Sequence, residues 1–187
     1  MDKFFDYSLN LETRTLTFFE EVTKASCERI IKQLHILDNH KDGTVTILMN
    51  SEGGCVSSGL AIYDAIRAMK NYVRIIVVGE CCSIDTVILQ AADERLLYPN
   101  AYLMLHYGNR TVEGHVKDTQ VWMKYYDDMD EICFNIYLEV VNNRQRFNKK
   151  KLIKINDLKS SMEFDKILLA DKAVKSGYAD RIIEGSY

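Results

Sequence analysis

Short apolar runs and amphipathic segments alternate along the chain, with polar turns between them. Residues 44–50 are too continuously apolar for a half-exposed strand, which indicates a strand buried on both faces of a sheet. Residues 57–70 then place apolar side chains three and four positions apart, the spacing of one helix face. The same order, a buried strand followed by a helix, is repeated at residues 73–78 and 83–92. Repeated strand-turn-helix units of this length predict an α/β fold with a parallel sheet and right-handed crossovers.

The rest of the chain continues this alternation. Gly177 is typical of the residue that ends a helix, and residues 149–155 fit neither period. Because no repeat, linker or low-complexity segment divides the chain, we predict a single domain over residues 1–187. The other predicted elements are strands at 13–19, 94–97, 102–106 and 180–183, and helices at 23–37, 114–141 and 170–176.

Composition narrows the class of protein. With 47% hydrophobic residues among 187, the chain can bury a full core. It has no apolar run of about eighteen residues, so we expect no membrane span. The net charge of −3 gives no reason to expect nucleic acid. The acidic residues within Met1–Tyr7 argue against a secretory signal. We therefore expect a soluble, cytoplasmic protein.

The five cysteines form no recognisable metal or disulfide pattern. Their number is odd and no pair has the spacing of a zinc finger. Cys81 and Cys82 are interpreted as small buried residues in a reducing compartment. Nothing in the sequence indicates a metal or an organic cofactor. The basic stretch Arg144–Lys154 is either a solvated surface element or a docking patch for an acidic partner.

Candidate chemistry lies where the predicted strands end, because active sites of α/β folds gather at the carboxyl ends of the strands. Gly53 and Gly54 follow the strand at 44–50, and paired glycines can turn the backbone sharply and expose an N–H group. This turn could supply an oxyanion donor, although by itself it indicates only a turn.

Ser83 and His106 are the two side chains with chemical potential at the other strand ends. Ser83 begins a predicted helix, where a serine is either an N-cap or a nucleophile beside free N–H groups. His106 ends an apolar strand, where a histidine is either structural or a general base. A serine–histidine pair needs a third group to orient the imidazole, and local sequence offers several acids without choosing among them. The Gly-x-Ser-x-Gly elbow of α/β-hydrolases is absent.

Several motifs in order resemble the Clp protease proteolytic subunit family, ClpP, over residues from about 12 to 183. The glycine turn and the following helix match that family's turn and its Gly-x-x-Ile-Tyr-Asp helix. The serine and histidine segments match those that hold its nucleophile and catalytic histidine. The matching segments are Ile47–Gly54, Gly59–Asp64, Gly79–Ile84, Leu97–Asn100, Met104–His106 and Ala173–Asp180.

The resemblance implies a ClpP/crotonase-like spiral of β-β-α units and an ATP-dependent serine endopeptidase. Ser83 would attack the peptide carbonyl, and His106 would take its proton and pass it to the leaving amine. Asp165 falls on the position of the family's third residue, and Asp157 is the nearest competing acid. The oxyanion donors would be the N–H groups of Gly54 and Ile84.

The resemblance also implies an assembly. The predicted long helix would belong to a handle at about 108–141 that joins two heptameric rings into a tetradecamer, aided by a strand at 108–114. The chain has no Walker A loop, so an AAA+ unfoldase ATPase would deliver the unfolded polypeptide substrate. The apolar face of this helix could equally pack on its own domain. That face is formed by Trp122, Tyr125, Met129, Ile132, Cys133, Ile136 and Val140.

The chain departs from the family pattern at several positions. Glu52 replaces a proline of the glycine turn, and extra residues, including the basic stretch, precede Asp165. Asp85 replaces a small residue just after the nucleophile, where its charge would either oppose an oxyanion or point away harmlessly. Asp85 and the displaced third acid favour a catalytically inactive ClpP-like structural ring subunit as the main alternative. A crotonase-like acyl-CoA enzyme, and a virus-encoded capsid-maturation protease of the same fold, also stay open.

Overall fold

The computed structural model of the protein describes residues 8–108 and 110–184. Within them the chain alternates strands and helices, as the sequence predicts, and forms one eight-stranded sheet with helices packed on it. The predicted domain of 1–187 also includes residues 1–7, 109 and 185–187, which lie outside the described residues. None of the helices in the described part is both long and apolar enough to cross a membrane.

The sheet runs in the order β1-β2-β3-β4-β5-β8, and β6 and β7 form a branch from β4. The pairs β1–β2 and β6–β7 are antiparallel and all other pairs are parallel. The parallel part agrees with the prediction from the buried apolar runs. The strands are β1 (Leu9–Asn10), β2 (Thr15–Phe18), β3 (Val45–Ser51), β4 (Val73–Cys82), β5 (Glu94–Leu97), β6 (Tyr102–Leu105), β7 (Lys166–Leu169) and β8 (Arg181–Ile182).

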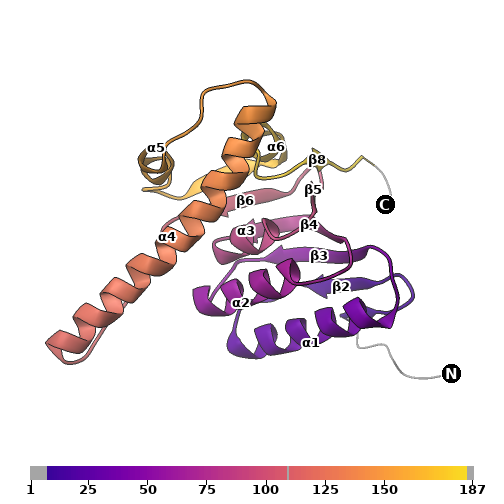
Figure 1. Cartoon of the computed structure of the whole chain (residues 1–187), viewed down its shortest axis with the longest axis horizontal. Coiled ribbons are helices and arrows are strands. Elements are labelled where there is room, and N and C mark those ends of the chain that lie inside the picture. Colours follow the sequence, from indigo (N-terminus) through magenta and orange to yellow (C-terminus); the bar gives the residue numbers. More distant parts are fainter. Residues whose placement is uncertain (1–7, 109, 185–187) are drawn as a thin grey trace.

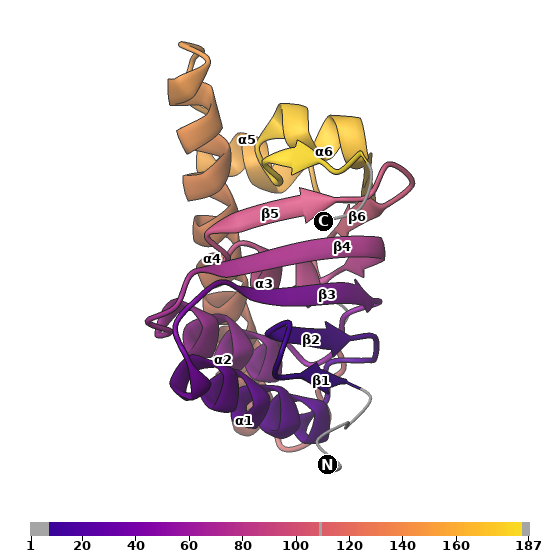
Figure 2. The same ribbon diagram turned by 90° about the vertical axis from the view of Figure 1, so that its right-hand side faces the viewer.

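The helices α1, α2, α3 and α4 lie behind the strands in Figure 2 and cover one side of the sheet. Their apolar faces and the sheet share one core that includes Leu16, Ile47 and Ile75, all essentially inaccessible to solvent. The first helix starts at a capping box in which the side chains of Thr23 and Ser26 each accept a hydrogen bond from the other's N–H. The helices are α1 (Lys24–His40), α2 (Val56–Arg67), α3 (Ile84–Leu89), α4 (Val116–Phe147), α5 (Ile155–Ser160) and α6 (Ala170–Ser176).

One edge of strand β4 changes partner along its length. Its residues Arg74–Val77 pair with β5 and its last residues, Glu80–Cys82, pair with β6, whereas the other edge stays paired with β3 as far as Cys81. Gly79 marks the change, because a Cβ at this position would lie 2.4 Å from the Asn50 Oδ1 atom. That oxygen instead accepts a hydrogen bond from the Glu80 N–H at 2.9 Å. The predicted end of this strand at residue 78 was therefore wrong: the apolar run stops there, but the pairing continues.

The long helix was predicted at 114–141 and extends over Val116–Phe147, with the His115 side chain accepting a hydrogen bond from the Lys117 N–H at its start. In Figure 1 the first half of α4 projects away from the sheet, whereas its second half lies against the body of the protein. Three further elements were missed or left open by the sequence. The strands β1 and β7 were not predicted, and the ambiguous residues 149–155 lead into α5. Strand β7 begins just after Asp165.

The strand implied at 108–114 is not formed by the described residues of that segment, 108 and 110–114. A strand needs a partner for its N–H and C=O groups. No strand of the described part of this chain pairs with that segment.

Candidate active site

Ser83 lies between the last residue of β4 and the first residue of α3. Its backbone has φ 54° and ψ −126°, a conformation that a residue with a Cβ adopts at a cost of about 1–3 kcal/mol. The Ser83 N–H donates to the Met104 carbonyl at 2.7 Å, which holds this turn against β6. Ser83 occupies the N-cap position of α3, as one of the two interpretations predicted, but its side chain makes no capping hydrogen bond to the helix. The hydroxyl is instead turned toward a histidine.

His106 is that histidine, and its Nε2 atom lies 2.9 Å from the Ser83 Oγ atom. The register of the two strands explains why the Ser83 and His106 side chains meet. Cys82 of β4 is paired with Met104 of β6 in a parallel arrangement, so both strands end at the same edge of the sheet. The residues that follow these two ends can therefore meet.

Asp165 approaches the other side of the imidazole. Its Oδ1 atom lies 3.2 Å from the His106 Nδ1 atom. The antiparallel pair of β6 and β7 places Leu105 opposite Lys166, so His106, which follows β6, faces Asp165, which precedes β7. His106 is 19% exposed and Asp165 is 66% exposed, which leaves the carboxylate at the rim of the site.

The glycine turn after β3 packs directly on the serine. A Cβ on Gly53 would lie 2.8 Å from the Ser83 Cβ and 3.4 Å from the Ile84 N. Both glycines have positive φ, 97° for Gly53 and 141° for Gly54. Val22 holds the turn through its N–H to the Gly53 carbonyl and its own carbonyl to the Cys55 N–H, each at 2.7 Å. These contacts fix the turn without a proline at position 52.

The Gly54 and Ile84 N–H groups are both unused by hydrogen bonds within the described residues. Ile84 is the first residue of α3, where an N–H has no partner inside the helix. Its side chain packs into the space left by Gly59, where a Cβ would lie 2.2 Å from the Ile84 Cγ1 atom. The sequence-predicted donors thus come from two elements that meet at Ser83.

Asp85, in the first turn of α3, is completely buried. Neither of its carboxyl oxygens has a hydrogen-bond partner among the described residues. Burial raises the pKa of this carboxyl to about 7, partly offset by the nearby Ser51 hydroxyl and Gly53 amide. The carboxyl therefore does not face solvent.

A cavity of about 440 Å³ opens beside the glycine turn. The start of α2 and one face of α4 form its walls, and Arg110 at its edge forms ion pairs with Asp127 at 2.7 Å and with Asp130. The sequence assigned the aromatic residues of this face to packing or assembly and missed their role in a cavity. The lining residues are Gly54, Cys55, Val56, Ser57, Gly108, Arg110, Trp122, Tyr125, Tyr126, Met129 and Asp130.

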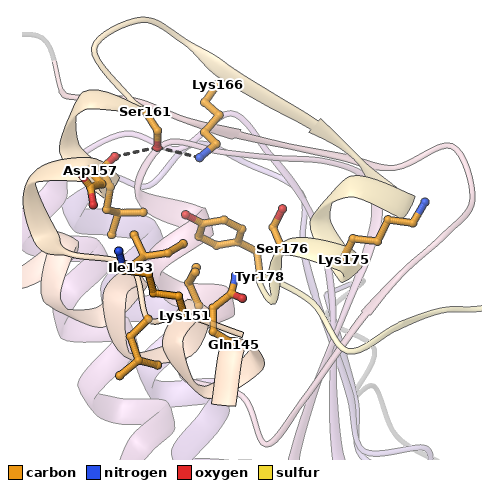
Figure 3. Close-up of a pocket in the computed structure, with 12 residues that line it drawn as sticks. Gln145, Lys151, Ile153, Asp157, Ser161, Lys166, Lys175, Ser176 and Tyr178 are labelled. Carbon is orange, nitrogen blue, oxygen red and sulfur yellow. Dashed lines mark hydrogen bonds between the residues drawn. The ribbon is translucent and has the colours of Figure 1, made fainter. Parts of the chain in front are cut away.

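A second cavity, of about 490 Å³, lies between the end of α4, α5 and α6 (Figure 3). The competing acid Asp157 lines this cavity, and so does Lys151 of the basic stretch. Lys166 donates to the Ser161 Oγ atom at 2.8 Å within it. Neither Ser83 nor His106 belongs to its lining, so Asp157 and this cavity are separate from the serine–histidine pair.

Two further features of the described residues bear on the chemistry. Cys81 and Cys82 are buried, as predicted, and burial raises the pKa of both thiols. The described residues contain no group of three or more His, Cys, Asp or Glu side chains that could hold a metal ion.

Comparisons with known proteins agree on one family. The sequence model of the Clp protease family matches residues 2–186. The chain is 30% identical over 145 residues to the ATP-dependent Clp protease proteolytic subunit of Carsonella ruddii, covering 76% of this chain and 75% of that protein. It is 29% identical over 181 residues to the subunit of the same description from Deinococcus radiodurans, covering 95% and 84%. A solved structure of a ClpP1 mutant from Listeria monocytogenes superposes with a TM-score of 0.80 at 24% identity, covers 94% of each chain and shows the shared fold.

Proposed function

Because the chain belongs to the Clp protease family and is therefore a ClpP-type peptidase, we propose that it is a serine endopeptidase that uses Ser83, His106 and Asp165. The observation that carries this proposal is the 2.9 Å separation of the Ser83 Oγ and His106 Nε2 atoms. This distance is within the reach of direct proton transfer from a hydroxyl to an imidazole. Because the chain matches the Clp protease family, we no longer consider the crotonase-like acyl-CoA enzyme as an alternative.

The geometry supports a two-step acyl transfer. His106 takes the proton of the Ser83 hydroxyl as the oxygen attacks the peptide carbonyl, and the N–H groups of Gly54 and Ile84 hold the resulting oxyanion. His106 then protonates the leaving amine, the peptide bond breaks, and a water molecule hydrolyses the acyl-enzyme. Asp165, 3.2 Å from the Nδ1 atom, keeps the imidazole oriented and stabilises its protonated form.

The cavity beside Gly54 supports the binding of one substrate side chain next to the scissile bond. Trp122, Tyr125 and Met129 give it an apolar aromatic wall. The Arg110 charge at its edge is engaged by Asp127 and Asp130, so it is not free to pair with an acidic side chain. We expect the site to favour large apolar residues over charged ones.

The family and the first half of α4 both support an assembly of several chains. Trp122 and Val121 there are 53% and 68% exposed, although the segment is amphipathic. Exposed apolar surface of this kind is typical of an interface between chains. We therefore propose a homo-oligomer of stacked heptameric rings, a tetradecamer, that receives unfolded polypeptides from an AAA+ unfoldase ATPase in the cytoplasm.

The burial of Asp85 favours a second candidate function, that of a catalytically inactive ring subunit. A buried carboxylate beside the oxyanion donors would oppose the negative charge of the transition state. The two candidates make opposite predictions for the same experiment.

The test is labelling of the purified, assembled protein with a fluorophosphonate probe, together with hydrolysis of an unstructured polypeptide. The wild type should be labelled at Ser83, and S83A should lose labelling and lower kcat by on the order of 10⁴-fold or more. S160A, which removes an exposed serine of α5, is the matched control and should behave like the wild type. An unlabelled, inactive wild type would establish the inactive subunit, and hydrolysis retained by S83A would exclude this serine as the nucleophile.

A further inference from the structure

The cavity between the end of α4, α5 and α6 has no role in the peptidase mechanism above. Its volume of about 490 Å³ lies within the range of about 300–1,000 Å³ that is typical of small-molecule sites. Asn142 of α4 fixes one wall, because its side chain accepts a hydrogen bond from the Ile153 N–H at 2.8 Å and donates to the Ile153 carbonyl at 3.0 Å. The segment that precedes α5 is therefore held against α4.

Lys166 brings into this cavity a positive charge that no carboxylate neutralises. Its amine donates to the Ser161 Oγ atom at 2.8 Å and lies 5.9 Å from the centre of the Tyr178 ring. It belongs to none of the ion pairs of the described residues. The side chain is half-buried, and burial lowers the pKa of this amine. An ammonium group has three donors, so a bound anion can accept from it and compensate for its lost hydration.

The Tyr178 hydroxyl is a second polar group at the cavity whose hydrogen-bonding capacity is unused. The residue is 1% exposed, and its hydroxyl has no hydrogen-bond partner within the part of the chain that the structure describes. In Figure 3 the hydroxyl is directed toward the α5 side of the cavity. Burial raises the pKa of Tyr178, so the hydroxyl keeps its proton at neutral pH and is a donor. A ligand that satisfies it must therefore offer an acceptor.

The other charges around the cavity also favour an anion. Lys151 of the basic stretch and Lys175 of α6 are exposed members of its lining and outnumber its one acid, Asp157 of α5. In the described residues none of these three side chains is part of an ion pair. Lys175 points away from the cavity in Figure 3, so it contributes charge at a distance and no contact. The lining as a whole is therefore positive.

The remaining lining residues suit an apolar group beside the anion. Val141 and Leu158 are each 2% exposed and line the cavity together with Ile153. Gln145 and Ser176 add a side-chain amide and a hydroxyl, which can bind a peptide group. A negative charge, an apolar side chain and a peptide group occur together in the C-terminal residue of a peptide.

We propose that this cavity binds an organic carboxylate with a branched apolar body, the chemistry shared by a C-terminal leucine of a peptide and a free aliphatic acid. The carboxylate pairs with Lys166 and accepts from the Tyr178 hydroxyl, and the apolar body contacts Val141 and Leu158. The inference does not depend on the proposed function, because neither Ser83 nor His106 belongs to the lining.

The experiment follows the δ1 methyl signals of isoleucine in ¹³C-methyl NMR spectra of the assembled protein. Ile153 lines the cavity, whereas Ile84 packs beside Gly59, so the two signals report on different sites. N-acetyl-leucine should shift the Ile153 signal with a Kd of about 1 mM, as expected for so small a ligand. N-acetyl-leucinamide, which lacks the negative charge, should bind about tenfold more weakly.

A third ligand separates the two sources of the carboxylate. 4-Methylpentanoate has the same apolar body and no peptide group. An affinity equal to that of N-acetyl-leucine would support a free aliphatic acid, and an affinity several-fold lower would support the end of a peptide.

Variants then test the two groups assigned to the carboxylate. K166M keeps most of the stem of the side chain and should abolish the preference for the acid over the amide. Y178F removes a hydroxyl without a partner, so it should fold like the wild type and bind the acid about fivefold more weakly. K172M, which removes an exposed lysine of α6 outside the lining, is the matched control and should bind like the wild type.

Three results would overturn the inference. The first is an Ile153 signal that N-acetyl-leucine does not move, including the case in which only the Ile84 signal moves. The second is equal affinity of the wild type for the acid and the amide. The third is a preference for the acid that both K166M and Y178F retain in full.

Discussion

The two halves of α4 share one apolar spacing and have opposite surroundings. In the second half, Phe134, Tyr137 and Val141 are 2–4% exposed and pack into the core. In the first half, Val116, Val121 and Trp122 are more than half exposed, and the helix projects from the body (Figure 1). The sequence offered core packing and assembly as alternatives for the apolar face. The difference between the halves shows that core packing explains the apolar residues of the second half only.

The sequence could not separate the two halves, because the spacing of apolar residues identifies the apolar face of a helix but not what packs against it. Thr86 and Tyr137 show what covers the second half. The Tyr137 hydroxyl lies 2.6 Å from the Thr86 Oγ1 atom, which donates to the Ser83 carbonyl, also at 2.6 Å. The second half of α4 is therefore tied to the backbone of the serine, whereas the first half has apolar side chains facing solvent.

Truncation of the covered half should have the largest effect on stability. F134A removes a 3% exposed ring that contacts Tyr107 and Tyr137, so it should lower the free energy of unfolding by about 3–5 kcal/mol. Urea denaturation followed by circular dichroism measures this loss. A cost below about 1 kcal/mol would mean that the second half is not part of the core.

Removal of a single hydroxyl from the same half should have an intermediate effect. Y137F deletes the donor to Thr86 and keeps the ring contact with Tyr178, whose centroid lies 5.9 Å away. Thr86 still donates to the Ser83 carbonyl, so we expect a loss of about 1 kcal/mol. Denaturation of Y137F beside the wild type measures it, and an unchanged midpoint would show that this hydrogen bond is not stabilising.

Truncation of the exposed half should have the smallest effect on the isolated subunit. W122A should change the unfolding free energy of the subunit by less than about 0.5 kcal/mol, because its ring is 53% exposed. It should nevertheless weaken assembly, which sedimentation velocity measures directly. The thermal midpoint of the wild type should rise with protein concentration, and that of W122A should do so less. Identical sedimentation of the two proteins would exclude this face as an interface.

The order of elements and the two strand ends that carry Ser83 and His106 could be read from the sequence, because buried parallel strands have a strong apolar signal. Asp165 came only from the resemblance. Its position depends on β7, a four-residue strand whose pairing with β6 is a long-range contact that no local pattern reveals. The full length of β4 was not predicted for the same reason. Glu80–Cys82 are extended because they pair with β6, and not because these residue types favour a strand.

Asp85 shows a different limit of sequence reasoning. An acid in the first turn of a helix usually faces solvent and complements the helix dipole. Here α3 is only six residues long and all six are buried, so the ordinary rule does not apply. Only the tertiary packing of α3 reveals that this carboxyl is enclosed.

The position of β7 has a consequence for how the protein responds to warming. This strand lies at an edge and, among the described strands, pairs with β6 alone; its outward residues Ile167 and Leu169 are 59% and 60% exposed. Peripheral segments of this kind open at a much smaller free energy than the whole fold. Fraying of β7 would carry Asp165 away from His106 while the sheet around β3 and β4 stayed intact. In the proposed mechanism, gentle heat would then stop catalysis reversibly, well before the protein melts.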